Sequence, residues 1–243
     1  MRIFTFANRN RKEILRDPIS LAFLLGFPIV LMLLLSAIQQ NIPTSLFEID
    51  HLAPGITVFG LSFVTLFSAT IIAKDRTGSL LQRLYTTPMT AFDFIFGYTL
   101  PLLPIALLQC LVCYLVALPL GLTLTVNLVY AILFLIPVSL IYIALGLLFG
   151  SILNDKQVGG ICGGLLTNLS AWLSGIWFDL GLVGGFFQKA AGYLPFMHAV
   201  ELERAALRGD IENALSHLWW VLGYAIVLMT AAILLFLRQM KRQ

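Results

Sequence analysis

Charged residues are what this sequence has least of. Only 11% of its 243 residues are Asp, Glu, Lys or Arg, whereas soluble domains carry about 25%. Hydrophobic residues make up 59% of the chain, and a run of 61 residues, Phe94 to Asn154, contains no Asp, Glu, Lys, Arg or His. A chain with so little polar surface cannot be covered by water alone, so lipid must surround most of it. The composition therefore predicts an integral membrane protein.

The sequence also lacks a phosphate-binding lysine. A phosphate loop ends in Gly-Lys-Ser or Gly-Lys-Thr, and the five lysines of this chain follow Arg, Ala, Asp, Gln and Met instead. This excludes a nucleotide-hydrolysing phosphate loop, so we expect no cofactor in this chain. Any ATP hydrolysis that drives it must occur on a separate subunit.

Ionisable groups inside the apolar segments are missing as well. Proton- or sodium-coupled carriers bury such groups near the membrane midplane. Their absence disfavours a secondary carrier or channel, which stays open as an alternative to an ATP-driven transporter. An intramembrane serine protease would need a histidine within a span, but His51, His198 and His217 fall in loops or at span ends. Cys110 and Cys113 lie one helical turn apart, yet a structural zinc site needs about four ligands. We therefore expect no metal site, and interpret the cysteines as small buried hydrophobes.

The apolar runs that are present have the length of membrane spans, which need about 20 residues each. Six segments qualify: 18–38, 52–73, 94–118, 128–150, 157–178 and 218–237. The uncharged run is too long for one crossing, and the Pro, Gly and Asn of residues 119–127 mark its turn. The sequence therefore predicts one all-α transmembrane domain over residues 1–243, with six transmembrane helices.

The basic residues orient these spans. Twelve of the fifteen Lys and Arg residues fall on one side if the N-terminus is cytoplasmic, and seven of the twelve acidic residues fall on the other. Cytoplasmic loops carry the excess of Lys and Arg. We therefore expect a multi-pass protein of the cell membrane with both termini in the cytoplasm.

Residues 1–17 form an amphipathic segment before the first span. On a helix, one face gathers Ile3, Phe4, Ala7, Ile14 and Leu15. Four cations lie largely elsewhere: Arg9, Arg11, Lys12 and Arg16. This pattern is typical of an interfacial helix on the cytoplasmic membrane surface.

The outer segment 179–217 is longer than a simple connector. Its first part is apolar but too short to cross the membrane. Its second part predicts a helix in which Glu201 precedes Arg204 by three residues and Gly209 ends the helix. We expect a partly re-entrant, partly surface-lying element before the last span, with His198 in a structural role.

A short basic segment, 75–88, interrupts the apolar runs in the cytoplasm. On a helix its apolar face comprises Leu80, Leu81, Leu84 and Tyr85, while Gln82 and Arg83 point away. Asp75 or Thr77 can cap its start, and Pro88 limits its length. A helix of two to three turns is marginal in water, so either the lipid surface or a partner protein must cover the apolar face.

The stretch DRTGSLLQRLYTTPM (75–89), followed by DFIFGY (93–98), resembles the cytoplasmic loop of type-2 ATP-binding-cassette (ABC) exporter permeases. Three further features match this family in the same order. They are RDP (16–18) after an amphipathic helix, a proline in the first span, and LPFMHAV (194–200) with a following Arg and Gly before the last span. Many family members carry a Glu in this cytoplasmic loop where Gln82 or a neighbour stands here.

The resemblance implies a permease that exports cargo by alternating access. The cytoplasmic loop would be a coupling helix seated in a cleft of an ABC ATPase subunit, with Leu81 and Leu84 in the cleft. The implied contact residues are Gly78, Ser79, Leu80, Leu81, Gln82, Arg83, Leu84 and Tyr85. The N-terminal helix would also pack on that subunit, which binds the ATP and Mg. A second permease half, identical or similar, completes the path for a drug, peptide antibiotic or lipid-like cargo, and no nucleic acid is involved.

The polar groups inside the spans are hydroxyls and amides. Ser62, Thr65 and Ala69 form a small stripe on the second span, and Asn168 lies on the fifth. This stripe predicts either close helix packing or the lining of a path for an amphiphilic cargo. Small-xxx-small glycines favour close contacts of the fourth and fifth spans: Gly146/Gly150, Gly159/Gly163 and Gly160/Gly164. By resemblance, the fifth span meets the first span of the other half.

Overall fold

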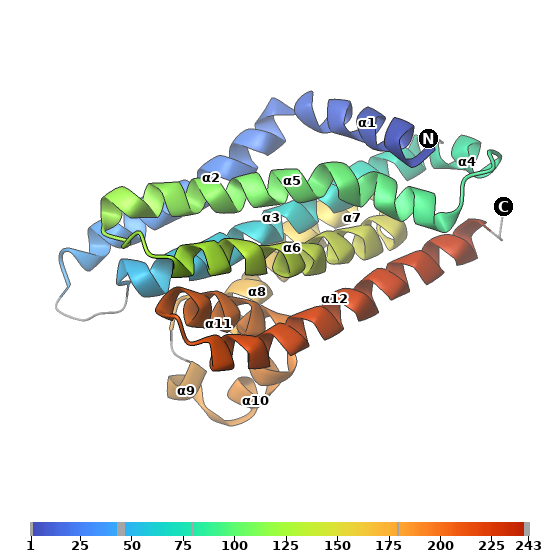
Figure 1. The fold of residues 1–243 in the computed structure, drawn as a ribbon. Helices are drawn as coiled ribbons and strands as arrows, with labels where there is room; N and C mark the ends of the chain where they lie inside the picture. The colour runs from blue at the N-terminus through green and yellow to red at the C-terminus, as the bar shows by residue number, and fades with distance from the viewer. Residues whose placement is uncertain (1, 43–46, 79, 179, 241–243) are drawn as a thin grey trace.

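A computed structural model describes residues 2–42, 47–78, 80–178 and 180–240, and in these ranges the chain is helical without a β-strand (Figure 1). Its long helices are α1 (Arg2–Leu15), α2 (Pro18–Gln39), α3 (Ile49–Thr77), α5 (Ala91–Ala117), α6 (Asn127–Ile152) and α12 (Ile211–Met240). Its shorter helices are α4 (Leu80–Tyr85), η1 (Leu118–Leu120), α7 (Asp155–Val158), the π-helix η2 (Gly159–Leu166), α8 (Thr167–Leu173), α9 (Leu180–Val183), α10 (Gly185–Tyr193) and α11 (Pro195–Arg208).

Five helices among the described residues are long and apolar enough to cross a membrane: α2, α3, α5 continued by η1, α6 and α12. Each has 22 to 30 residues, and a bilayer's hydrocarbon core needs about 20. They coincide with the first four predicted spans and the sixth. Helices α3 and α12 extend beyond the predictions, since α3 runs to Thr77 and α12 already begins at Ile211.

Helix α3 lies at the centre of the bundle and packs against α2, α5, α6 and α11. Its contact with α6 is close because α6 carries glycines. A Cβ added to Gly146 would lie 1.6 Å from Ser68 Oγ, and one added to Gly150 would lie 2.7 Å from the Ala69 carbonyl oxygen. Small residues let helix backbones approach in this way, so the predicted close contact of the fourth span is confirmed.

The predicted span 157–178 has a different form. The chain is helical from Asp155 to Leu173 through α7, η2 and α8, and then turns at residues 174–178. Four glycines at positions 159, 160, 163 and 164 weaken the α-helix here, and the middle eight residues adopt a π-helix. We expected one regular membrane-length α-helix over residues 157–178, and the structure has three shorter helical pieces instead.

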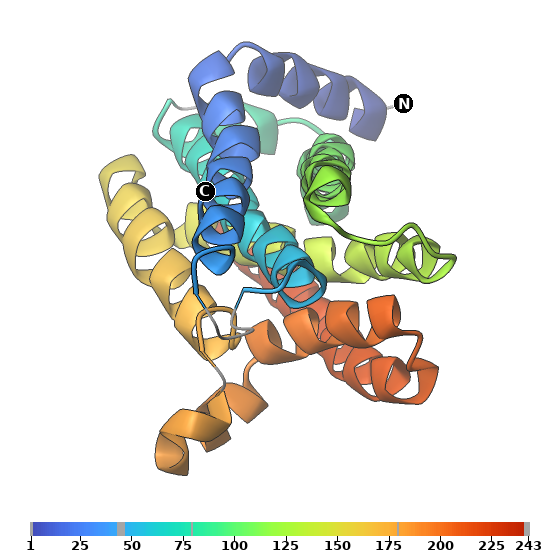
Figure 2. The same ribbon diagram turned by 90° about the vertical axis from the view of Figure 1, so that its left-hand side faces the viewer.

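The two ends of the bundle carry different elements (Figures 1 and 2). The first turn of α1, the short helix α4 and the last turn of α12 lie at one end, which we name the α4 end. Helix α11 packs on α12, α6 and α3 near the opposite end. The predicted helix before the last span is confirmed as α11, and Gly209 ends it with a φ of 77°, a conformation that suits glycine.

Candidate functional site

Helix α1 docks against α5 through an aromatic and polar face at the α4 end. The Phe6 ring packs edge-on to Phe94 and Tyr98, with centroid separations of 5.7 and 5.0 Å. The buried Asn10 side chain donates to the Gly97 carbonyl oxygen at 3.0 Å. Gly97 makes this approach possible, because a Cβ there would lie 2.3 Å from the Phe6 ring.

This docking corrects the apolar face predicted for the N-terminal helix. The buried residues are Phe6, Ala7, Asn10 and Ile14, so only two members of the predicted stripe are covered. Phe4 is 68% exposed and Leu15 is 61% exposed. Helix α1 therefore packs on α5 with a different face from the one that its amphipathic pattern predicts for contact with the membrane surface.

A partly buried ion pair holds α1 to α3. Arg9 donates to both carboxylate oxygens of Asp75 at 2.6 and 2.7 Å, and the Tyr98 hydroxyl donates to the same carboxylate at 2.7 Å. The side chain of Asp75 is 3% exposed and that of Arg9 is 37% exposed. Burial lowers the pKa of Arg9, but the hydrogen bond and charge of Asp75 outweigh this, so the pKa is raised. Asp75 thus lies in α3 and binds Arg9, instead of capping the next helix as expected.

Carbonyl groups at the end of α6 are bound by two neighbouring helices. The Arg76 guanidinium on α3 donates to the carbonyl oxygens of Ser151 and Leu153. Gln239 on α12 donates to the Ser151 carbonyl oxygen at 2.7 Å. These are the acceptors that a helix C-terminus leaves without intrahelical partners. The side chains therefore join α3, α6 and α12 at the α4 end.

Helix α4 is shorter than the predicted segment 75–88 and covers only residues 80–85. Leu81, which we expected to seat in a partner's cleft, is 1% exposed and belongs to the chain's own core. Leu80 and Leu84 are partly exposed, and Arg83 is exposed. Gly78 ends α3, with its N–H donating to the Lys74 carbonyl oxygen at 2.8 Å. Ser79 and the side chains of Gln82 and Tyr85 lie outside the described residues.

An apolar groove separates α1 from α4 and the segment that follows it. Its volume is about 460 Å³, and its apolar lining includes Phe6, Leu80, Leu84 and Met89. Arg2 and Arg9 also line it. We name it the α1–α4 groove. It offers an apolar surface with cationic groups beside it, which is an arrangement that can accept an apolar side chain from an acidic partner surface.

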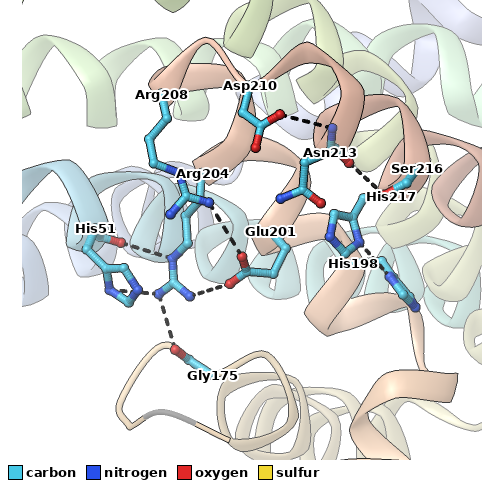
Figure 3. Close-up of polar contacts among 10 residues, drawn as sticks. All are labelled: His51, Gly175, His198, Glu201, Arg204, Arg208, Asp210, Asn213, Ser216 and His217. Carbon is cyan, nitrogen blue, oxygen red and sulfur yellow. Dashed lines mark hydrogen bonds and ion pairs between the residues drawn. The ribbon is translucent and has the colours of Figure 1, made fainter. Parts of the chain in front are cut away.

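Arg204 anchors α11 at the other end of the bundle (Figure 3). Its side chain is buried and forms an ion pair with Glu201 at 2.8 Å, as the spacing of the two residues predicts. It also donates to the Gly175 carbonyl oxygen at 3.1 Å, and one of its nitrogens lies 3.1 Å from His51 Nδ1. The guanidinium therefore links α11 to α3 and to the turn that follows α8.

Two histidines join α10, α11 and α12 (Figure 3). His198 Nδ1 lies 2.8 Å from His217 Nδ1, and His198 Nε2 lies 2.9 Å from the Gly192 carbonyl oxygen. A carbonyl only accepts, so Nε2 of His198 carries the hydrogen and Nδ1 of a neutral His198 accepts from His217. The His198 ring also stacks on Trp220 at 4.8 Å. Burial lowers the pKa of His198, and the Gly192 hydrogen bond opposes this in part.

The hydroxyls predicted as candidates for a cargo path lie between helices. Thr65 Oγ1 donates to the Tyr142 carbonyl oxygen of α6, and Ser62 Oγ donates to the Phe59 carbonyl oxygen of its own helix, both at 2.7 Å. Both side chains are fully buried, so neither lines an open path in this structure. Asn168 is exposed on α8 and donates to the Gly164 carbonyl oxygen at 2.8 Å. The packing interpretation of the Ser62–Thr65 stripe therefore describes this conformation.

These helices define a multi-pass membrane protein of the plasma membrane, with a docked N-terminal helix and a short helix beside an apolar groove. The family model of the ABC-2 type transporter matches residues 1–207, so the chain belongs to that family. It is therefore a permease subunit of an ABC transporter and not a catalytic ATPase domain, and its family associates with an ABC ATPase subunit. No curated protein sequence matches the chain.

Proposed function

We propose that this chain is one half of an ATP-driven exporter that moves an amphiphilic cargo outward by alternating access. The observation that carries this proposal is the α1–α4 groove, which places an apolar surface beside the basic side chains of Arg2 and Arg9. In the proposed complex an ABC ATPase subunit occupies this groove and transmits its motion through α4 and α1. The ATPase subunit binds the ATP and Mg.

The proposed topology has six crossings with both termini in the cytoplasm. The beginning of α1 and the end of α12 lie at the same end of the bundle (Figure 1), and this supports an even number of crossings. The helical stretch 155–173 supplies the sixth, because its 19 residues come close to the length that a hydrocarbon core of about 30 Å requires. The excess of Lys and Arg at the α4 end supports its cytoplasmic location.

Leu84 is the residue through which the proposed ATPase contact is tested. Full burial of a leucine contributes about 1.5–3 kcal/mol, and a carboxylate forced into an apolar pocket is unfavourable in addition. Leu84→Asp should therefore weaken the complex by more than tenfold in a pull-down of the ATPase subunit. Leu81→Asp is not a useful test, since it places a charge in the chain's own core.

Thr86→Asp is the matched control, because Thr86 is exposed and does not line the groove. It introduces the same charge two residues from Leu84 and should leave the complex intact. Normal ATPase binding and normal ATP-driven export by the Leu84→Asp protein would reject the groove as the docking site. Transport by the purified chain alone under a proton or sodium gradient would instead favour a secondary carrier.

A second permease half is proposed to pack on two surfaces that this chain leaves uncovered. Helix α2 exposes large apolar side chains, among them Ile19, Phe23 and Val30. On the helical stretch 155–173, positions Gly160 and Gly164 have no neighbouring heavy atom within 4 Å of an added Cβ. Glycines allow close approach of another helix, so the exposed bulky face of one half fits the glycine face of the other.

Cysteine cross-linking between two tagged copies tests this arrangement. Val30→Cys in one copy and Asn168→Cys in the other should form a disulfide-linked dimer, since both positions are exposed at similar distances along their helices. Leu108→Cys, exposed on α5, replaces Val30→Cys in the control and should give no dimer with Asn168→Cys. Equal cross-linking of both pairs would refute the proposed pairing of the two faces.

A further inference from the structure

Glu203 on α11 is a carboxyl group in an unusual position. Its side chain is 0% exposed, although the residue belongs to a helix that does not cross the membrane. Oε2 accepts a hydrogen bond from the Tyr114 hydroxyl of α5 at 2.9 Å. Oε1 is buried and has no hydrogen-bond partner in the part of the chain that the structure describes. A charged carboxylate is strongly disfavoured in such surroundings unless a cation compensates it.

No cation within 4 Å pairs with Glu203 among the described residues. The neighbouring Arg204 binds Glu201, His51 and the Gly175 carbonyl oxygen. The titratable groups on the helices around α11 are uncharged, bound to other partners or, for Lys189, exposed to solvent, and α8 carries none. They are Tyr114, Cys110 and Cys113 of α5, Tyr142 of α6, His51 of α3, His217 and Tyr224 of α12, and the exposed Lys189 and Tyr193 of α10.

We propose that Glu203 is a proton-binding site, which holds a proton while α11 is docked on the bundle beside Tyr114 and releases it when α11 moves and exposes the carboxyl group. The proton resides on Oε1, because Oε2 already accepts from Tyr114. On release, the O–H bond breaks and water takes the proton, leaving a solvated carboxylate. That this water lies outside the cell rests on the topology proposed above, whereas the protonated state of Glu203 does not depend on it.

Protonation couples the position of α11 to pH. Burial raises the pKa of Glu203 well above its ordinary value, and the hydrogen bond from Tyr114 opposes this in part. The docked state therefore binds the proton more tightly than the exposed state. The resulting stabilisation of the docked state is complete at a pH below the ordinary glutamate pKa. It is lost as the pH rises through the raised pKa of the docked Glu203. Between these values the equilibrium between docked and exposed α11 shifts by up to about tenfold per pH unit.

Infrared difference spectroscopy of the reconstituted chain tests the protonated state directly. The C=O stretch of a protonated carboxylic acid should be present at neutral pH, shift in D₂O and disappear on alkaline titration. Glu203→Gln should lack this signal, while the control Glu212→Gln, at an exposed position of α12, should retain it. A missing signal at neutral pH, or an unchanged one in Glu203→Gln, overturns the proposal. If Glu203→Gln fails to fold, Tyr114→Phe still tests it, because loss of the donor should move the titration to higher pH.

Labelling of a buried position tests the coupling to helix movement. In a chain whose three cysteines are replaced by alanine, Val200→Cys reports exposure of α11, since Val200 is fully buried. The rate of alkylation at Val200→Cys is divided by the rate at Phe186→Cys, an exposed position. The ratio removes the pH dependence that every thiol shows in this reaction. The ratio should rise from neutral to alkaline pH, and Glu203→Gln should abolish the rise. A ratio independent of pH with Glu203 present would refute the coupling. Neither experiment requires ATP or cargo, so failure of the proposed export function is recognised separately.

Discussion

Replacement of Arg9 by methionine should release α1 from the bundle without unfolding it. Arg9→Met keeps an unbranched side chain at this position but removes the guanidinium, which donates both hydrogen bonds to the buried Asp75 carboxylate and also pairs with Glu13 on α1. Removal of one partner of a fully buried pair is unfavourable by about 3–5 kcal/mol. Because Arg9 is 37% exposed and Tyr98 still donates to Asp75, we expect a smaller loss of about 2–3 kcal/mol. This corresponds to a roughly 30- to 150-fold increase in the detached fraction of α1.

Hydrogen exchange of the α1 amides measures this detachment. Protection should fall in α1 by that factor while α6 remains protected, because the opening is local. Asp75→Asn combined with Arg9→Met should recover much of the protection, since no charge is then left buried without its partner. Arg11→Met is the control, because the Arg11 guanidinium donates to the Asn8 side chain of its own helix. Unchanged protection in Arg9→Met, or losses that simply add in the double variant, would refute an ion pair as the fastening of α1.

Three further predictions concern helix contacts and pH. Gly97→Val should displace α1, because a Cβ would lie 2.3 Å from the Phe6 ring; hydrogen exchange in α1 should rise while the remaining helices stay protected. Gly146→Leu should lower the melting temperature, and Ser68→Ala should not rescue it because a backbone carbonyl oxygen also lies 2.9 Å from the added Cβ. The lowered pKa of His198 means that its hydrogen bonds stabilise the docked α11 above the ordinary histidine pKa of about 6.5. This stabilisation should be lost as pH falls through the lowered pKa of His198, so hydrogen exchange at the start of α11 should increase in acid. His198→Phe should abolish this pH dependence of the exchange. Exchange independent of pH in the unaltered protein would contradict it.

The membrane spans could be predicted from the sequence because lipid imposes a single local requirement. A stretch of about 20 apolar residues satisfies it wherever the rest of the chain lies. The end of α3 could not be predicted in this way. Asp75 reads as the polar start of a new segment, yet it continues α3 because Arg9, 66 residues earlier, neutralises it in the fold.

Helix α4 shows what the spacing of apolar residues cannot predict when a helix lies between the core of its own chain and an exposed groove. The spacing of Leu80, Leu81 and Leu84 correctly predicts a short helix with an apolar arc. It does not tell which part of that arc faces the chain's own core. Leu81 is covered by the fold itself, while Leu84 remains at the groove, and the packing of α4 against α3 decides between them.

The same limit explains why Glu203 was missed. Long apolar segments identify the ionisable groups that lipid buries, and α11, with 14 residues, is too short to be such a segment. Glu203 is buried because α11 packs against α3, α6 and α12, and the sequence does not show that these helices meet. The helical period does place Glu203 on the apolar face of α11, because it lies four residues after the buried Ala199 and next to the buried Leu202.

Arginine side chains, scarce in this chain, fasten two helices that are too short to cross a membrane. Arg9 joins α1 to α3, and Arg204 joins α11 to α3 and to the turn after α8. Apolar packing between helices differs little from packing against lipid, so it discriminates weakly between positions of a helix. An ion pair or a buried hydrogen bond fixes one position and is lost as a unit when the element moves. We therefore expect α1 and α11 to be the helices that change position, whereas the close glycine-mediated contact of α3 with α6 should stay fixed.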